Sequence, residues 1–296
     1  MIRYETRNWL SIVVRVRGTV LSRVALRALT CGALAWLLVY IQATRDVDLS
    51  IPVVVHSIVG VALGLLLVFR TNTSYDRYWE GRRNIGDLIG HCRDLARQTS
   101  SYLAKDPERR ALAGRHIVAF YLAVKRSLRC EREHPELVDL LGDERAVTLE
   151  RAEQVPLSLT AWLTEIYVAA ADDGLITETR LRNLDTNLTS LSAFWADLDR
   201  IRTTPVPFAY AHHIKVFLSL FCFTVPFALA DLSSWYAIGG AVLVAFALFG
   251  IDEIGVEIED PFGYDPNDLP LDEIGAHLEA EVFSLTEGRK PSDPQP

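Results

Sequence analysis

The hydrophobic residues of this chain are concentrated in four runs of membrane-spanning length. The runs occupy residues 25–44, 51–69, 214–230 and 235–251. A bilayer core about 30 Å thick requires about 20 apolar residues of helix, so each run predicts a transmembrane helix. Short polar links at 45–50 and 231–234 join the runs into two helical hairpins.

The alternative is a soluble protein in which these runs are buried helices. This alternative is favoured by Lys215 and the prolines, which interrupt the apolar character of the third run. However, half of the residues are hydrophobic and the mean hydropathy is +0.16. Four runs of spanning length seldom occur together in one soluble domain of this size, so a membrane protein is the better interpretation.

Basic residues predict the orientation of the spans. Four arginines precede or open the first run and four follow the second, namely Arg15, Arg17, Arg23, Arg27, Arg70, Arg77, Arg82 and Arg83. The short links carry only Arg45. By the positive-inside rule, both termini and the large middle region are expected to be cytoplasmic. The N-terminal segment shows no small-residue cleavage site, so a cleaved signal peptide is not expected.

The rest of the chain predicts an all-α architecture. Between the hairpins, apolar residues recur at helical spacing, as at Leu184, Leu188 and Leu191. We therefore expect a helical cytoplasmic domain over residues 71–212. The complete division is an N-terminal segment with the first hairpin (1–70), this domain, the second hairpin (213–251), an acidic cytoplasmic segment (252–286) and a disordered tail (287–296).

The second run carries two patterns on adjacent helix faces. One is an apolar stripe, and the other is a pair of glycines that allows a neighbouring helix to pack closely. Val61, Leu65 and Phe69 recur every four residues and share one face of a helix. Gly60 and Gly64 form a G-x-x-x-G on an adjacent face, which allows neighbouring helices to approach closely. From the residues alone, a lipid-facing or core stripe is the simpler interpretation of the first pattern.

A polar segment follows the second run immediately. Thr71 to Ser74 are weak helix formers, and Thr73 to Asp76 fits a capping box with Asp in place of Glu. Either the helix ends near Thr71 and restarts, or it continues with Tyr75 and Trp79 on one face and Arg70 and Arg77 on another. The aromatic and basic residues at this position are typical of an interfacial anchor.

Four elements of the chain resemble the bestrophin family of ion channels, in particular its bacterial branch. They read "FRTNTSYDRYWEGRR", "RIRTTPVPFAYAHH", "FCFTVPFALADL" and "EIEDPFGYDPNDLPLD", in the order and spacing of the family. The resemblance implies a homopentamer in a bacterial inner membrane. Each subunit would contribute four membrane helices and a helical cytoplasmic domain around a single pore on the fivefold axis.

The resemblance also implies particular site residues. Val61, Leu65 and Phe69 match the three apolar positions of the pore neck. Thr179 falls near the second, cytoplasmic constriction, where apolar residues are usual in the family. Asp260, Asp265 and Asp268 match the position of the calcium clasp of eukaryotic members, and their oxygens could bind Ca²⁺, although Tyr264 and Pro266 interrupt the acidic run.

The expected function is therefore conduction of monovalent ions. The net charge of -8 and the resemblance to bacterial members both favour cations such as sodium. The alternatives are an anion (chloride) channel of the same fold and a membrane-anchored helical scaffold that does not conduct. No motif indicates an enzyme, a required cofactor or a nucleic-acid partner; beside its own copies, the bilayer and the permeating ions are the expected partners.

Overall fold

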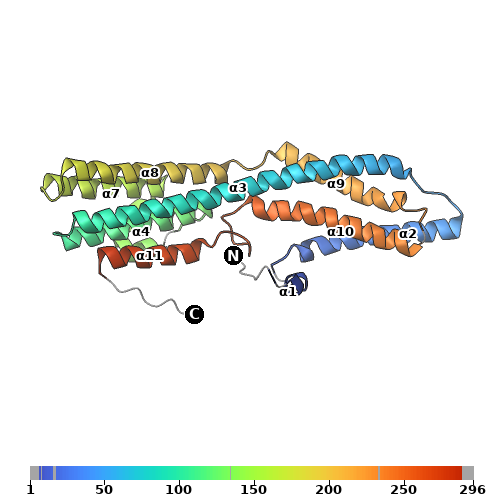
Figure 1. Cartoon of the computed structure of the whole chain (residues 1–296), viewed down its shortest axis with the longest axis horizontal. Helices are drawn as coiled ribbons and strands as arrows, with labels where there is room; N and C mark the ends of the chain where they lie inside the picture. The colour runs from blue at the N-terminus through green and yellow to red at the C-terminus, as the bar shows by residue number, and fades with distance from the viewer. Residues whose placement is uncertain (1–6, 8, 16–17, 134, 233, 289–296) are drawn as a thin grey trace. The chain divides into compact units, whose positions relative to one another are not determined.

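The computed structural model describes residues 7, 9–15, 18–133, 135–232 and 234–288. The chain forms two compact units, and Figure 1 shows their helices. The first unit contains residues up to Trp79 together with Pro205–Asp268. The second contains Glu80–Thr204 and the residues from Leu269 onward.

The first unit is built from long apolar helices. Its helices are α1 (Trp9–Val13), α2 (Leu21–Arg45), the part of α3 (Val53–Tyr102) up to Trp79, α9 (Phe208–Ala228) and α10 (Ser234–Glu259). In the described part of the chain, four helices are long and apolar enough to cross a membrane: α2, α3, α9 and α10. The four predicted spans are thereby confirmed as helices of suitable length and composition.

Small residues let the helices of the first unit approach closely. Ala28, Cys31 and Ala35 form a buried face of α2, and Ala241 and Ala245 do the same on α10. A Cβ added to Gly32 of α2 would lie 2.5 Å from Val242 Cγ2 of α10, so glycine is needed at this crossing. This is the packing expected of membrane helices, whose association depends on close van der Waals contact rather than on the hydrophobic effect.

Boundaries in the first unit differ from the sequence-based expectation, most clearly at the fourth run and the acidic segment after it. The fourth run does not end at Ile251, because α10 continues as a helix to Glu259. The predicted acidic segment 252–286 is divided between the units after Asp268. Its first carboxylates therefore belong to α10 and to the loop that follows, where basic residues of α2 and α3 pair with them. This pairing explains why α10 can continue through acidic residues after its apolar run ends.

The second unit is also helical. It contains the rest of α3, followed by α4 (Pro107–Leu128), α5 (Pro135–Leu141), α6 (Asp143–Glu150), α7 (Val155–Asp172), α8 (Glu178–Thr203) and α11 (Leu271–Thr286). Local chemistry explains where helices begin. Asp106 caps α4 by accepting a hydrogen bond from the backbone NH of Arg109, and Pro107 occupies the first turn.

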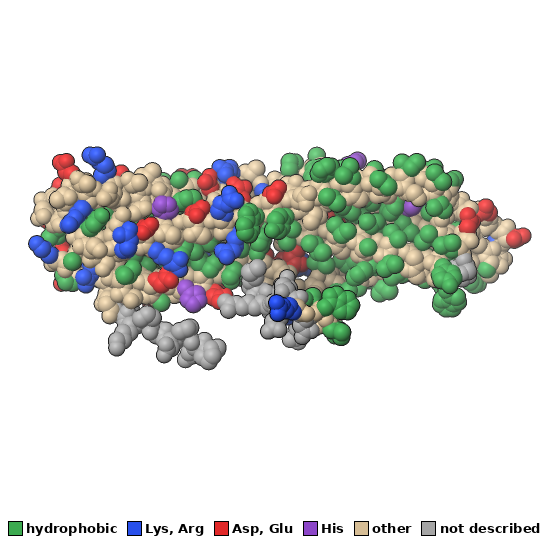
Figure 2. Space-filling model, viewed as in Figure 1, with side chains coloured by type: hydrophobic (Ala, Val, Ile, Leu, Met, Phe, Trp, Pro, Cys, Tyr) green, Lys and Arg blue, Asp and Glu red, His purple; other side chains and the backbone are tan. Residues whose placement is uncertain are grey.

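Buried tyrosines hold the helices of the second unit together. Tyr121 of α4 donates a hydrogen bond to the backbone oxygen of Leu271 (2.8 Å), and the Thr99 and Tyr167 hydroxyls lie 2.6 Å apart. In Figure 2, hydrophobic side chains cover much of the visible surface of the first unit, whereas charged side chains gather on the second. The predicted disordered tail, 287–296, falls mostly outside the described residues; Glu287 is described and pairs with Arg115.

Candidate pore-lining helix and its charged neighbours

The segment after the second apolar run is helical throughout. α3 extends from Val53 to Tyr102 without interruption, so the helix does not break at Thr71. The Thr71 hydroxyl donates to the backbone oxygen of Leu67 (2.9 Å) and the Thr73 hydroxyl to that of Phe69 (3.0 Å). These hydroxyls bond back into the preceding turn instead of capping a new helix, so the predicted capping box is not formed.

The three predicted neck residues lie on a face of α3 that is largely exposed within the described part of the subunit. The exposed fractions are 76% for Val61, 56% for Leu65 and 55% for Phe69. On the opposite face, Leu63 and Leu67 are buried in the core of the first unit. α3 is therefore anchored by one side and presents an apolar stripe on the other. In this environment the stripe can face a pore, a neighbouring copy or lipid.

The two glycines of the G-x-x-x-G motif are not equivalent. A Cβ at Gly60 would lie 3.0 Å from the ring of Phe221, so this glycine allows α9 to approach. A Cβ at Gly64 would meet nothing within 4 Å. Only the first glycine is required by packing within the described part of one chain.

The exposed stripe continues past Phe69 with polar residues. Asn72, Asp76 and Trp79 are exposed and follow at spacings of three and four residues, which keeps them on the same helical face as Leu65 and Phe69. We did not predict Asn72 and Asp76 as site residues. The same spacing rule, extended beyond the apolar run, would have identified them.

Arg70, which follows the last predicted neck residue, is buried rather than exposed. Its guanidinium pairs with Asp252 of α10, and both side chains are 2% exposed. Glu259 (3.8 Å) is a further partner of Arg70, and Lys215 of α9 pairs with Asp252 (3.4 Å). An exposed arginine is typical of an interfacial anchor, but the Arg70 side chain turns towards α10 instead.

A second set of ion pairs joins α2 to α10. Arg27 donates to Glu253 (2.9 Å), and Arg23 lies within 3.7 Å of Glu253 and 3.8 Å of Glu257. Glu253 and Glu257 are buried. The arginines that predicted orientation in the sequence thus also neutralise the acidic end of α10.

The loop with the proposed calcium ligands is organised by local hydrogen bonds. The backbone NH of Asp265 donates to Asp268 (2.7 Å), and that of Phe262 donates to Asp260 (3.2 Å). Burial and the neighbouring carboxylates raise the pKa of Asp268 to about 6. Among the described residues, no three or more His, Cys, Asp or Glu side chains are grouped to hold a metal ion. Calcium binding by this loop stays a prediction. The carboxylates of Asp260 and Asp268 accept backbone hydrogen bonds of the loop, whereas that of Asp265 pairs with Arg23 of α2 (3.2 Å).

The predicted cytoplasmic constriction lies at the start of α8. Thr179 is exposed and belongs to the first turn, after the N-cap residue Thr177. Exposed Glu178 and Arg180 flank it, and Arg180 also lies over the ring of Tyr102 (5.0 Å). The position is accessible within the subunit, and its role in a constriction stays a prediction.

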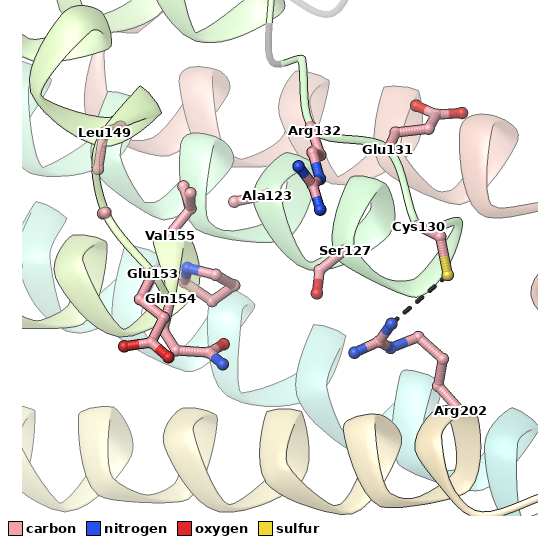
Figure 3. A pocket seen from close by; sticks show the side chains of 12 residues that line it. Ala123, Ser127, Cys130, Glu131, Arg132, Leu149, Glu153, Gln154, Val155 and Arg202 are labelled. Atoms are coloured by element: carbon pink, nitrogen blue, oxygen red, sulfur yellow. Dashed lines mark hydrogen bonds between the residues drawn. The ribbon is translucent and has the colours of Figure 1, made fainter.

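The second unit contains a polar cavity of about 510 Å³. Figure 3 shows Ser127, Arg132 and Arg202 around it, and Arg202 donates to the sulfur of Cys130 (3.4 Å). Arg202 is also paired with Asp199 (2.7 Å). The lining contains both arginine and glutamate side chains, so it favours neither sign of ligand.

Comparison with known proteins identifies the family. The model of the bacterial and fungal bestrophin proteins matches residues 1–284. The chain is a bestrophin. Bestrophins are ion channels rather than enzymes, and bestrophin channel structures are pentameric, so this all-helical membrane protein has the fold of a pentameric channel.

Named bestrophin relatives cover nearly the whole chain. A voltage-dependent anion channel-forming protein of Nostoc sp. is 37% identical over 284 residues, which cover 95% of this chain and 92% of the relative. A protein of the same description from Synechocystis sp. is 35% identical, with 94% and 92% covered. The crystal structure of a bacterial bestrophin homologue from Klebsiella pneumoniae is 25% identical, has a TM-score of 0.84, and matches 90% of this chain and 99% of that one.

Proposed function

We propose that five copies of this bestrophin assemble in the inner membrane into an ion channel, with α3 of each copy lining the pore and both termini cytoplasmic. The observation that carries the proposal is the exposed stripe of Val61, Leu65 and Phe69 on a helix whose other face is buried. The family match and the pentameric channel fold support the assembly.

The stripe would act as a hydrophobic gate. A ring of apolar side chains presents no hydrogen-bonding partner to water or ions, so a narrow ring blocks conduction by dewetting. Widening the ring would admit a continuous water column. The neck would therefore control whether ions pass, whereas charged residues beyond it would determine which ions pass.

We propose that the permeating ions are anions. The Nostoc and Synechocystis relatives are named as anion channel-forming proteins, and this supports the chloride alternative over our cation preference, which the comparisons do not support. Arg82 and Arg83 are exposed on α3 after the neck. Rings of arginine are one means by which pores attract anions.

Cation conduction is kept as a second candidate because of Asp76. This exposed carboxylate lies on the same helical face as Phe69. In a pentamer it would be repeated five times near the end of the neck, and rings of Asp or Glu are typical of cation pores.

Replacing Val61, Leu65 and Phe69 together with alanine is expected to increase the current. The smaller side chains widen the neck and lower the cost of wetting it. The measurement is macroscopic and single-channel current of the purified protein in planar bilayers. Ala62→Ser, an exposed position on the same helix, serves as the control. If neither wild type nor triple variant carries current, the channel proposal fails and a non-conducting scaffold is favoured.

The reversal potential under a KCl gradient decides between the two ions. We expect it to approach the chloride equilibrium potential, and Asp76→Asn to leave its sign unchanged. Arg83→Gln should move it towards zero if arginines attract the permeating anion. A wild-type potential near that of potassium, reduced by Asp76→Asn, would instead establish the cation candidate.

A further inference from the structure

A cavity of about 230 Å³ lies between α2, α9 and α10 within the first unit. Its lining combines two cationic side chains, two hydroxyls, one carboxylate and three apolar side chains: Arg27, Lys215, Thr30, Ser219, Asp252, Leu218, Phe223 and Phe249. The three contributing helices are all candidate membrane spans. The cavity is therefore formed by segments that a bilayer surrounds.

The two cations retain hydrogen-bonding capacity. Lys215 is 47% exposed, and its partner Asp252 is already paired with the buried Arg70. The Lys215 ammonium group has three N–H donors, and its contact with Asp252 is a long 3.4 Å. Arg27 has five N–H donors and uses one nitrogen for Glu253. Both side chains can thus bind an additional anion without giving up their present partners.

The polarity of the lining changes along the helices. On α9, Lys215, Ser219 and Phe223 follow one another at four-residue intervals, so they lie on one face over a rise of about 12 Å. On α2, Arg27 and Thr30 repeat the first two steps of this order, a cationic side chain followed by a hydroxyl. The order is cation, hydroxyl and aromatic ring, proceeding from the arginine-rich end of the spans towards the apolar interior. A phospholipid has the same order of phosphate, glycerol and acyl chain.

We propose that this cavity binds the headgroup of an anionic phospholipid, with its phosphate between Arg27 and Lys215 and its acyl chains along Phe223 into the bilayer. At about 30 Å³ per water molecule of liquid, the cavity of about 230 Å³ has the volume of roughly seven water molecules. That is room for a small polar group such as phosphoglycerol but not for acyl chains. Basic pockets between membrane helices are a recurring means of binding anionic headgroups. The inference does not depend on conduction.

The test uses the full-length protein purified in a neutral detergent. Binding of phosphatidylglycerol and of phosphatidylcholine is titrated separately and quantified by native mass spectrometry. We expect wild type to prefer phosphatidylglycerol. Lys215→Gln should weaken that binding about fivefold, since one basic residue near the membrane surface contributes about 1 kcal/mol to attraction of anionic lipid. Its effect on phosphatidylcholine should be small.

Two further variants separate binding from folding. Ser219→Leu fills the cavity without removing an ion pair and should also weaken phosphatidylglycerol binding. Lys105→Gln makes the same chemical change at an exposed lysine of the second unit and should bind like wild type. The oligomer peak in size-exclusion chromatography and the melting temperature in neutral detergent verify that each variant is folded.

Three results would overturn the proposal. One is equal affinity of wild type for the two lipids. Another is wild-type phosphatidylglycerol affinity in both Lys215→Gln and Ser219→Leu. The third is displacement of phosphatidylglycerol by millimolar glycerol 3-phosphate, which would show that the site binds a soluble phosphate without needing the acyl chains.

Discussion

Arg70→Met is expected to destabilise the protein by about 3–5 kcal/mol, the usual cost of removing one partner of a buried ion pair. The guanidinium of Arg70 and the carboxylate of Asp252 are both 2% exposed. Without Arg70, Asp252 keeps only the 3.4 Å contact with the half-exposed Lys215. An almost uncompensated charge would then remain buried between α3 and α10.

The apparent melting temperature in detergent measures this effect. At the roughly 2–4 °C per kcal/mol typical of domains of about 150–250 residues, the expected loss corresponds to a decrease of roughly 6–20 °C. Arg82→Met removes an exposed arginine from the same helix and should change the melting temperature little. A double variant, Arg70→Met with Asp252→Leu, should recover much of the loss because the two fully buried charges are removed together. A melting temperature for Arg70→Met within 2 °C of wild type would contradict the assignment.

Acidification from pH 7 to pH 4 is expected to destabilise the second unit through His116. This histidine of α4 is fully buried, and its Nδ1 donates to the backbone oxygen of Leu112 (2.8 Å). Its Nε2 therefore accepts from Arg145 of α6 (2.7 Å). Burial, with a further contribution from the Arg145 charge, lowers the pKa of His116 to about 4. Protonation at Nε2 would place a second positive charge against the guanidinium.

The sign of the pH effect follows from proton binding. In the unfolded chain histidine has a pKa of about 6.5, so between pH 6.5 and pH 4 the unfolded state binds more protons than the folded state. The free energy of unfolding consequently falls as the pH is lowered through this range. The expected loss due to His116 is about 3 kcal/mol when pH 4 is reached.

Comparison of variants isolates this contribution. His116→Gln should reduce the difference between the melting temperatures at pH 7 and pH 5, whereas His277→Gln, at an exposed position of α11, should not. The quantity compared is the change in melting temperature between pH 7 and pH 5, so a lower stability of the His116 variant at pH 7 does not affect the comparison. If His116→Gln showed the same change in melting temperature between pH 7 and pH 5 as wild type, other groups would control the acid response.

The segment after Phe69 shows why local patterns are insufficient at the end of an apolar run. Thr71 and Thr73 have low helix propensity, and the sequence allowed either a break or a continuous helix. The helix continues with both hydroxyls bonded to the preceding turn, and Ser74 is fully buried on its inner side. Helix propensity is a weak preference, and tertiary packing overrides it.

The position of Arg70 illustrates a different limitation. Its neighbours in the sequence place it at the end of an apolar run, where an exposed side chain is the usual expectation. Its partner Asp252 lies 182 positions away along the chain. Contacts over such separations leave no local pattern, so only the packed structure shows that this arginine is internal to the subunit.

The sequence by itself determined the four spanning helices, the all-α class and the face shared by Val61, Leu65 and Phe69. These features depend on hydropathy and on helical periodicity, which a single sequence contains in full. Tertiary structure decided that this face is exposed while the opposite face is buried, that α10 extends to Glu259, and that Arg23, Arg27 and Arg70 pair with its acidic end. The physical reason is that burial and ion pairing are properties of helices in contact, and periodicity within one helix cannot specify which helix lies beside it.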